Sequence, residues 1–391
     1  MTDARALAAA ALPDAVAWRR HLHANPELSF QEHETSRWIA ERLESFGGLT
    51  VARPTATSVV ATLRGGRPGG RCIALRADID ALPILEETGL DFASTCDGVM
   101  HACGHDGHTA VLLAVARGLA AQRDELAGEL RFVFQHAEEL PPGGAREIVA
   151  SGALDGVQAV LGCHLMSTFE AGKVSVSPGP VMAAADFFDA TIEGTGGHGA
   201  FPHETVDPIA IAAEVISSLQ QIVSRTVDPL QSAVVSVTRI HAGTANNVIP
   251  QSVNFGGTTR CFDEGVRAAL HERLRTLVAG IAAAHGAKGT IDITTAFDPV
   301  INDAALAAQV EASARRAVGD AQLLRIPPMM GGEDFSNYAS VAPITYWFVG
   351  ARNPAKGAEW PHHHPRFTVD EQALETAIAV MAQVAVDQAS L

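Results

Sequence analysis

The order of the expected strands and helices constrains this chain more than any other feature of its sequence. Through about residue 163, short apolar β-rich runs alternate with helix-like stretches, which is typical of an α/β layer with a largely parallel sheet. Between residues 187 and 295 the order changes to strand, helix, strand, strand, helix and strand, the pattern of a small two-layer sandwich. The C-terminal residues then return to the α/β pattern.

This change of pattern predicts two domains, because a single hydrophobic core rarely grows to the 391 residues of this chain. We expect residues 1–182 and 297–391 to form one discontinuous α/β domain with helices flanking a mostly parallel sheet, and residues 183–296 to form an inserted α+β domain. The expected helices cover residues 31–46, 107–121, 207–223 and 264–285, with two more from 303 and 370. The expected strands cover residues 71–76, 131–135, 157–163, 187–192, 233–240, 252–259, 290–295 and 344–349.

The charge balance excludes several classes of partner. Lys and Arg total 28 against 44 Asp and Glu, a formal net charge of −16, so phosphate backbones and anionic lipid surfaces should be repelled.

The cysteines and the apolar runs bear on the compartment. The five cysteines are scattered and odd in number, so they do not form the pattern of a disulfide framework and suit a protein of a reducing compartment. No run approaches the ~18 apolar residues that span a bilayer. We read the Ala-rich stretch 6–12 as the start of a surface helix, because it has no basic segment before it. We therefore expect a cytoplasmic protein that binds neither nucleic acid nor membranes.

The densest polar cluster is Met-His-Ala-Cys-Gly-His-Asp-Gly-His-Thr at residues 100–109. It lies between a strand region and a buried helix, where α/β folds place ligands. Its histidines and its cysteine suit a metal that takes nitrogen and sulfur ligands. Taken alone, the cluster could equally be a polar helix cap with unrelated histidines.

Three further motifs could contribute to the same site. Glu138 and Glu139 follow an apolar strand, where a metal on one carboxylate would leave the other free as a base, although two solvated loop acids would look the same. His164 ends another expected strand, and a lone histidine there is more often structural. His363 lies in the Pro-flanked run Pro-His-His-His-Pro-Arg-Phe at residues 361–367, which could also be a solvated loop.

The inserted domain carries a separate group of polar residues. Glycines surround His198 in Gly-Gly-His-Gly-Ala and would let backbone and imidazole approach a ligand closely. Asn247 and Arg260 could hold a carboxylate, and arginine does so with two hydrogen bonds. Ordinary turns would also account for these glycines. No Gly-x-Gly-x-x-Gly or phosphate-loop pattern opens a helix, so the sequence gives no support for a nucleotide cofactor.

Taken together, the motifs resemble a known family. The chain contains Arg-x-Leu-His-x-x-Pro-Glu-Leu-x-Phe-x-Glu at residues 20–32, and Arg-Ala-Asp-Ile-Asp-Ala-Leu-Pro at 76–83. His-Ala-Cys-Gly-His-Asp, Phe-Gln-x-Ala-Glu-Glu, Gly-Gly-His-Gly-Ala, Asn-Asn-Val-Ile-Pro and His-x-Pro-x-Phe follow in the same order. This order is similar to the hippurate hydrolase and indoleacetyl-amino-acid hydrolase branch of the aminoacylase/carboxypeptidase metallohydrolases, and the resemblance runs from about residue 18 to 372.

The resemblance implies specific roles for individual residues. Glu138 would be the general base, Cys103 would bridge two metal ions as a thiolate, and Asp78 would orient a ligand from behind. It implies further metal ligands and substrate contacts, namely His105, Glu139, His164 and His363 for the metals, and His198, Asn247 and Arg260 for the substrate. His362 and His364 do not match the motif and are expected to be loop residues. His136 replaces the usual proline of the branch and puts the local loop shape in doubt.

The implied activity is hydrolysis of the amide bond of small N-acyl amino acids, with acetyl, benzoyl or indoleacetyl groups. Metal-activated water would attack the carbonyl while Glu138 accepts its proton. Two divalent ions per subunit are expected, and Zn, Mn, Co and Ni all tolerate the ligand set. In the family the inserted domain acts as a lid and pairs two subunits, so that His198 and Asn247 would reach the partner's site in a homodimer.

Three alternatives remain open on the sequence. A dipeptidase or carboxypeptidase-like hydrolase could use the same metal centre with a different acyl pocket. A metal-dependent small-molecule binding protein would need no general base, whereas Glu138 is present. A structural zinc module would cluster its ligands in Cys-x-x-Cys pairs, whereas these candidates extend from residue 103 to 363.

Overall fold

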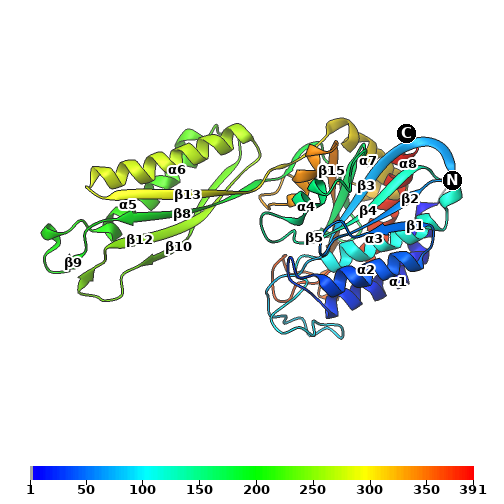
Figure 1. The fold of residues 1–391 in the computed structure, drawn as a ribbon, viewed down its shortest axis with the longest axis horizontal. Coiled ribbons are helices and arrows are strands. Elements are labelled where there is room, and N and C mark those ends of the chain that lie inside the picture. The colour runs from blue at the N-terminus through cyan, green and yellow to red at the C-terminus, as the bar shows by residue number, and fades with distance from the viewer. Residues whose placement is uncertain (1–2) are drawn as a thin grey trace. The chain divides into compact units, whose positions relative to one another are not determined.

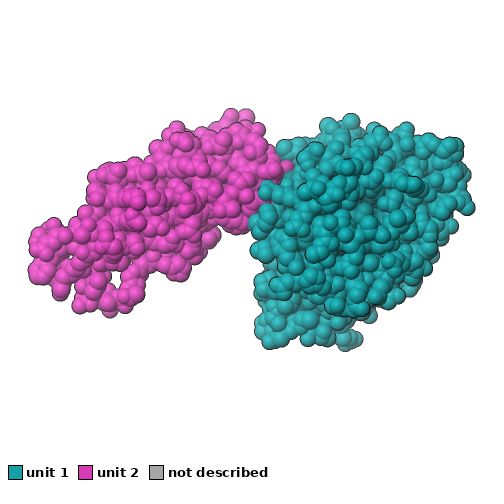
Figure 2. All heavy atoms as spheres, in the orientation of Figure 1, with its two compact units in different colours: residues 1–181, 301–327, 334–391 teal, residues 182–300, 328–333 magenta. Residues whose placement is uncertain are grey.

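The computed structural model describes residues 3–391 and divides the chain into two compact units (Figure 2). Unit 1 contains the described part of Met1–Val181 together with Ile301–Pro327 and Asp334–Leu391. Unit 2 contains Met182–Val300 and also the short segment Pro328–Glu333. The chain therefore leaves unit 1 twice and returns to it twice.

Unit 1 is built on a seven-stranded sheet in the order β1-β2-β4-β3-β5-β15-β6 (Figure 1). The four central strands β4, β3, β5 and β15 pair parallel to one another, whereas the outer pairs are antiparallel. The prediction of an α/β fold is confirmed, and its mostly parallel sheet corresponds to these central strands. The strands are β1 (Leu49–Ala52), β2 (Val59–Arg64), β3 (Arg67–Asp78), β4 (Ala127–Gln135), β5 (Val160–Glu170), β6 (Val174–Ser175) and β15 (Ile344–Arg352).

Helices α3 and α8 pack against each other and against β3, and α1 covers both of them from outside. The expectation of a buried helix near residues 107–121 is confirmed, since α3 is buried along most of its length. Its small and aliphatic side chains allow this close packing on the sheet. The helices of unit 1 are α1 (Ala4–Ala24), α2 (His33–Ser45), α3 (His105–Ala120), α4 (Gly144–Ala150), α7 (Ala304–Val318) and α8 (Gln372–Ala389).

Unit 2 has a four-stranded antiparallel sheet in the order β10-β12-β8-β13, with helices α5 and α6 packed on it. Alternate side chains of β8, such as Phe188, Ala190 and Ile192, are buried in the core that these helices share. Phe187, on the other face of the strand, is exposed. The elements are β8 (Ala184–Glu193), α5 (Pro208–Gln221), β10 (Ala233–Ala242), β12 (Ser252–Cys261), α6 (Glu264–Ala284) and β13 (Lys288–Phe297).

Two small sheets complete the fold. Strands β9 (Gly197–His198) and β11 (Val248–Ile249) form an antiparallel ribbon in unit 2, and β7 (Gly179–Met182) pairs with β14 (Val300–Asn302). Strands this short carry too little periodicity to be predicted from sequence. Within residues 3–391, no helix is long and apolar enough to cross a membrane.

Candidate metal centre and catalytic site

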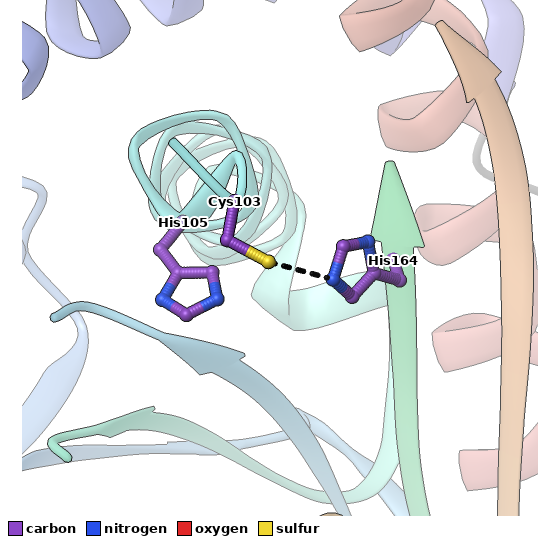
Figure 3. Close-up of side chains that lie close together, drawn as sticks. All are labelled: Cys103, His105 and His164. Atoms are coloured by element: carbon purple, nitrogen blue, oxygen red, sulfur yellow. Dashed lines mark hydrogen bonds between the residues drawn. The ribbon is translucent and has the colours of Figure 1, made fainter. Parts of the chain in front are cut away.

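The segment from Cys103 to His105 begins the candidate site at the N-terminus of α3. Gly104 caps this helix with a φ of +95°, a conformation that L side chains rarely adopt, and it turns the chain sharply between its two neighbours. His105 is therefore the first residue of α3 and is 1% exposed. Figure 3 shows the side chains of Cys103, His105 and His164 around one space, with Cys103 Sγ 3.5 Å from His164 Nε2.

The orientation of the His105 ring is set by Asp80. Nδ1 donates to the Asp80 carbonyl oxygen at 2.9 Å and lies 3.2 Å from Asp80 Oδ1. Nε2 is buried and has no hydrogen-bond partner among residues 3–391, with Glu139 Oε1 at 3.9 Å. Burial alone would lower the pKa of His105, but the charges of Asp78 and Asp80 raise it to about 10. The surroundings of this nitrogen therefore favour a positive charge.

The two glutamates lie in a tight turn directly after β4. Ala137 has a φ of 48°, which is uncommon for a residue other than glycine, and it redirects the chain before Glu138. The backbone N–H of Glu139 donates to Asp80 Oδ2 at 3.0 Å. Asp80 therefore contacts both His105 and the glutamate turn. Ligand atoms of Glu138, Glu139 and His105 lie within 4.8 Å of one another.

His363 reaches the same cluster from the C-terminal part of unit 1. Its φ of 64° and the donation of its N–H to the Ala102 carbonyl at 2.8 Å bring Nε2 to 3.2 Å from Glu139 Oε1. The contact with Glu139 raises the pKa of His363. The neighbouring histidines are engaged elsewhere, since His362 Nε2 donates to the Leu165 carbonyl at 3.0 Å and the His364 ring stacks on Trp360.

His164 does not end its strand, and the expectation that it would is wrong. It lies within β5, which continues to Glu170 because β15 pairs with β5 along this length. The pairing of β3 with β5 ends earlier, at Arg76 and Gly162, and beyond it the side chains of His108 and His362 bond to the backbone of Leu165 instead. Its Nδ1–H donates to the Leu165 carbonyl at 2.9 Å, and this tautomer leaves the Nε2 lone pair directed at Cys103.

Three overlapping groups of side chains could hold cations here. In each, the ligand atoms lie within 4.8 Å of one another: Cys103 with His105 and His164, Cys103 with Glu139 and His363, and His105 with Glu138 and Glu139. Burial, followed by the charges of Glu139 and Glu138, raises the pKa of Cys103 well above its usual value. A buried, unpartnered His105 nitrogen beside several carboxylates and a thiol fits divalent metal ions that accept nitrogen, sulfur and oxygen ligands.

Asp78 and His108 form a fourth candidate group with His105, but they have other partners. The Nδ1–H of His108 donates to Asp78 Oδ1 at 2.6 Å, and its Nε2 accepts the Leu165 N–H at 2.9 Å, so both ring nitrogens are engaged. Asp78 also accepts from Arg76 Nη1 at 2.7 Å and lies 3.6 Å from His105 Nε2. Asp78 therefore lies directly behind the cluster and close to a candidate ligand.

Unit 2 carries the three residues expected to contact substrate. His198 lies in β9 opposite Val248 of β11, and the Asn247 carbonyl accepts the Gly199 N–H at 2.8 Å, so the ribbon brings His198 and Asn247 together. Both are exposed. Arg260 is partly buried near the far end of β12, where desolvation lowers its pKa and a Cβ on Gly332 would lie 3.1 Å from Nη1.

Comparison with known proteins gives a direct family assignment. Residues 74–387 match the model of peptidase family M20/M25/M40. An N-acyl-L-amino acid amidohydrolase of Geobacillus stearothermophilus is 55% identical over 74% of this chain and 78% of that protein. An N-acetylcysteine deacetylase of Bacillus subtilis is 44% identical over 94% of this chain and 95% of its own.

The chain belongs to peptidase family M20/M25/M40. The crystal structure of a dinuclear metal-binding M20 peptidase of Bacillus subtilis superposes with a TM-score of 0.82 at 39% identity, covering 96% of this chain and 98% of that one. The resemblance inferred from the sequence motifs is thereby confirmed. This M20 protein is a hydrolytic enzyme that acts on amides.

Two supporting carboxylates of this M20 enzyme, Asp80 and Glu32, carry no functional prediction from the sequence. Asp80 belongs to the motif at residues 76–83, and its position two residues after Asp78 was the available signal. Glu32 ends the first motif, and its Oε1 accepts the Ala137 N–H at 2.8 Å. The His136 substitution is accommodated: its Nε2 lies 3.0 Å from Glu147 Oε2 and its ring packs against Phe30.

Proposed function

We propose that this enzyme hydrolyses the amide bond of small N-acyl amino acids, with Glu138 as the general base. The observation that carries the proposal is the turn after β4, where Glu138 and Glu139 lie together against His105. One carboxylate can bind a cation while its neighbour stays available for proton transfer. The names of the two relatives above, an N-acyl-amino-acid amidohydrolase and an N-acetylcysteine deacetylase, support this substrate class.

The proposed cofactor is a pair of divalent cations held by unit 1. Cys103 would bridge them, and the remaining ligands would be His105, Glu139, His164 and His363. When bound, such ions polarise a carbonyl oxygen and lower the pKa of water toward about 7. The dinuclear M20 peptidase of Bacillus subtilis supports the number of ions. Zn, Mn, Co and Ni remain the candidates, because each tolerates this ligand set.

The proton transfers are assigned to Glu138. Its carboxylate, 6% exposed, would accept a proton from the water that attacks the scissile carbonyl and then deliver it to the leaving amine. The low exposure limits competition from bulk water. Asp78 and Asp80 would take no part in proton transfer, and would orient the ligands from behind.

We further infer that two chains contribute to each substrate site. Ser252 and Arg260 are eight residues apart on β12, which corresponds to roughly 25 Å of extended strand, so the ribbon carrying His198 and Asn247 lies far from Arg260 within one copy of unit 2. One small substrate cannot contact both positions in a single chain. A homodimer paired through unit 2 would supply Arg260 from one subunit and His198 with Asn247 from the other.

The activity is tested by following amino-acid release from N-acetyl, N-benzoyl and indoleacetyl amino acids, with dipeptides in the same panel. The metal-loaded enzyme, the chelated enzyme and Glu138→Gln are compared, and Zn, Mn, Co or Ni is added back. Release that requires metal and Glu138 supports the proposal and identifies the acyl group. Turnover of dipeptides alone would assign the enzyme to the peptidase alternative.

Subunit exchange tests the shared site. Glu138→Gln and His198→Ala homodimers should each be inactive, whereas a hybrid dimer keeps one site in which both residues are intact. After complete 1:1 exchange half of the dimers are hybrids, so about a quarter of wild-type activity should return. A mixture that stays inactive after exchange is verified would show that each chain supplies its own His198.

A further inference from the structure

The side chain of Glu32 is turned away from the helix that it begins. Glu32 is the N-cap residue of α2, a position where side chains commonly accept the free N–H groups of the first turn, but it makes no such bond. Glu27 accepts them instead, from Thr35 N at 2.7 Å and Glu34 N at 3.2 Å. The Glu32 carboxyl can therefore make contacts outside this helix, and Glu32 is 0% exposed.

Glu32 Oε1 accepts two hydrogen bonds, both from the backbone N–H groups of residues in the left-handed conformation. One comes from Phe30 at 3.0 Å, and the other from Ala137 at 2.8 Å. The φ angles of these residues are 64° and 48°, a region that costs a non-glycine residue about 1–2 kcal/mol. Ala137 is 105 positions away in the sequence, so this contact is tertiary and joins the start of α2 to the end of β4.

The Ala137 contact is one of three that define the glutamate turn. The Ala137 carbonyl accepts the Gly144 N–H at 3.0 Å, and the Glu139 N–H donates to Asp80 Oδ2 at 3.0 Å. Glu138 therefore lies between two backbone amides that are each held by a buried carboxyl group, Glu32 before it and Asp80 after it. Fixing both flanking amides restricts the direction in which the Glu138 side chain leaves the backbone.

We propose that Glu32 is a positioning residue that holds Ala137 in its left-handed conformation and so directs the Glu138 carboxylate. The catalytic part of this inference rests on the role proposed for Glu138, whereas the structural part does not. In this proposal Glu32 has no direct contact with the substrate or with the metal ligands. Its effect on turnover passes through the backbone of the turn.

Glutamine should replace Glu32 with little loss. Burial, followed by the charge of Asp80, raises the pKa of Glu32 to about 7, so about half of the molecules carry a protonated, uncharged carboxyl at neutral pH. A neutral amide of the same shape keeps an oxygen that can accept both N–H groups. Alanine removes this acceptor and leaves the Ala137 N–H buried and unpaired.

Hydrogen exchange of the metal-loaded enzyme tests the structural part. In the peptide covering residues 134–140, the Ala137 amide should exchange at least about 5-fold faster in Glu32→Ala, the effect of losing about 1 kcal/mol of protection. The Glu139 amide, held by Asp80, is the internal reference. Glu32→Gln should match wild type. Glu27→Ala is the matched control, because it removes a neighbouring carboxyl that contacts α2 and not the turn.

Steady-state kinetics on the preferred substrate test the catalytic part. Glu32→Ala should lower kcat on the order of 10- to 100-fold while KM changes by less than about 3-fold, since a misplaced base affects the chemical step more than binding. Glu32→Gln should recover kcat to within about 3-fold of wild type. A general loss of stability would instead affect Glu27→Ala to a similar degree.

The outcomes separate the two parts. Unchanged exchange at Ala137 in Glu32→Ala, or normal kcat despite faster exchange, would overturn the inference. If the alanine variant does not fold, Glu32→Asp withdraws the acceptor by one methylene and must show the same fast exchange. If wild type hydrolyses none of the substrates, the proposed function fails, while the exchange data still decide whether Glu32 holds the turn.

Discussion

The candidate metal-binding cluster of unit 1 and the β9–β11 ribbon of unit 2 present their polar side chains in opposite ways. His105, Glu138 and His164 are between 1% and 6% exposed, and His105 is held by a residue 25 positions away. His198 and Asn247 are exposed, and the ring of His198 accepts a hydrogen bond from the N–H of Ala200, two residues along the chain. The cluster is thus fixed by tertiary contacts, and the ribbon by local backbone pairing.

This difference indicates how each region can contribute to catalysis. Buried ligands with fixed rotamers can bind cations without reorganising, which favours tight binding and a defined geometry. An exposed histidine loses conformational freedom when it engages a substrate, and its hydrogen bond strengthens only when water is excluded. The ribbon therefore needs a second surface to become effective, and the proposed partner subunit would provide one.

The largest expected effect is that of Glu138→Gln. Removing the base should lower kcat by roughly 10³-fold, within the range for general acid–base catalysis, because glutamine cannot accept the proton. The affinity for metal should stay within a few-fold of wild type, since Glu139 is retained. The check combines kcat on the preferred substrate with metal titration by calorimetry.

A joint loss of turnover and metal binding in this variant would contradict that assignment. It would indicate that Glu138 is a metal ligand and part of the buried cluster, and that it does not act as a separate base. Glu147→Gln is a suitable control, because this carboxylate is 53% exposed and contacts His136 beside the turn.

The next expected effect is that of His198→Ala, which addresses the ribbon. We propose that His198 donates a hydrogen bond to the oxyanion that develops on the substrate. Losing one such donor typically reduces kcat by about 10²–10³-fold, and we expect the lower end because the residue is exposed in unit 2. Metal affinity should not change at all. His203→Ala, at another exposed histidine of the same unit, is the control. If His198→Ala also released metal, the division of labour between the two regions would be wrong.

The candidate site was more predictable from sequence than the contacts that support it. Cys103, Glu139 and His363 belong to motifs whose chemistry is visible in the residues themselves. The sequence predicts that His164 ends a strand, whereas the pairing of β15 with β5 continues to Glu170. Pairing between distant strands is not encoded in the local pattern.

The supporting carboxylates illustrate a second limit. Asp78 and Asp80 are two residues apart at the end of β3, so the sequence cannot tell which of them contacts His105 Nδ1. Which of the two carboxyl groups reaches His105 depends on where β3 ends in the folded structure. Glu32 would be read as a helix cap, and only the tertiary fold brings its carboxyl to Ala137. Motifs therefore indicate the reacting groups, whereas the structure is needed for the groups that orient them.

A smaller effect is expected for Asp80→Asn, which loosens the cluster without removing a ligand. Weakening the contacts to His105 and to the Glu139 N–H should lower metal affinity by about 10- to 100-fold, the usual range for a residue behind a ligand. At saturating metal most of kcat should return. Metal titration followed by kinetics at several metal concentrations measures both. An unchanged metal affinity would show that the contacts of Asp80 with His105 and with the Glu139 N–H do not preorganise the cluster for metal binding.

The smallest expected effect is on stability and concerns the proton on Glu32. Its pKa is raised to about 7 in the folded enzyme, so between the unfolded value near 4.5 and about 7 the folded state binds more protons than the unfolded state. The contribution of this group to stability is complete below the lower value and is lost as the pH rises through the upper one. Between pH 6 and 8 the loss should be about 1 kcal/mol. Glu32→Gln carries no such proton, so the difference in unfolding free energy between wild type and this variant should follow that curve in urea titrations at each pH. A difference that is constant from pH 5 to 8 would show that Glu32 is charged throughout. The buried carboxyl would then hold Ala137 as an anion, and the glutamine variant would no longer be its neutral equivalent.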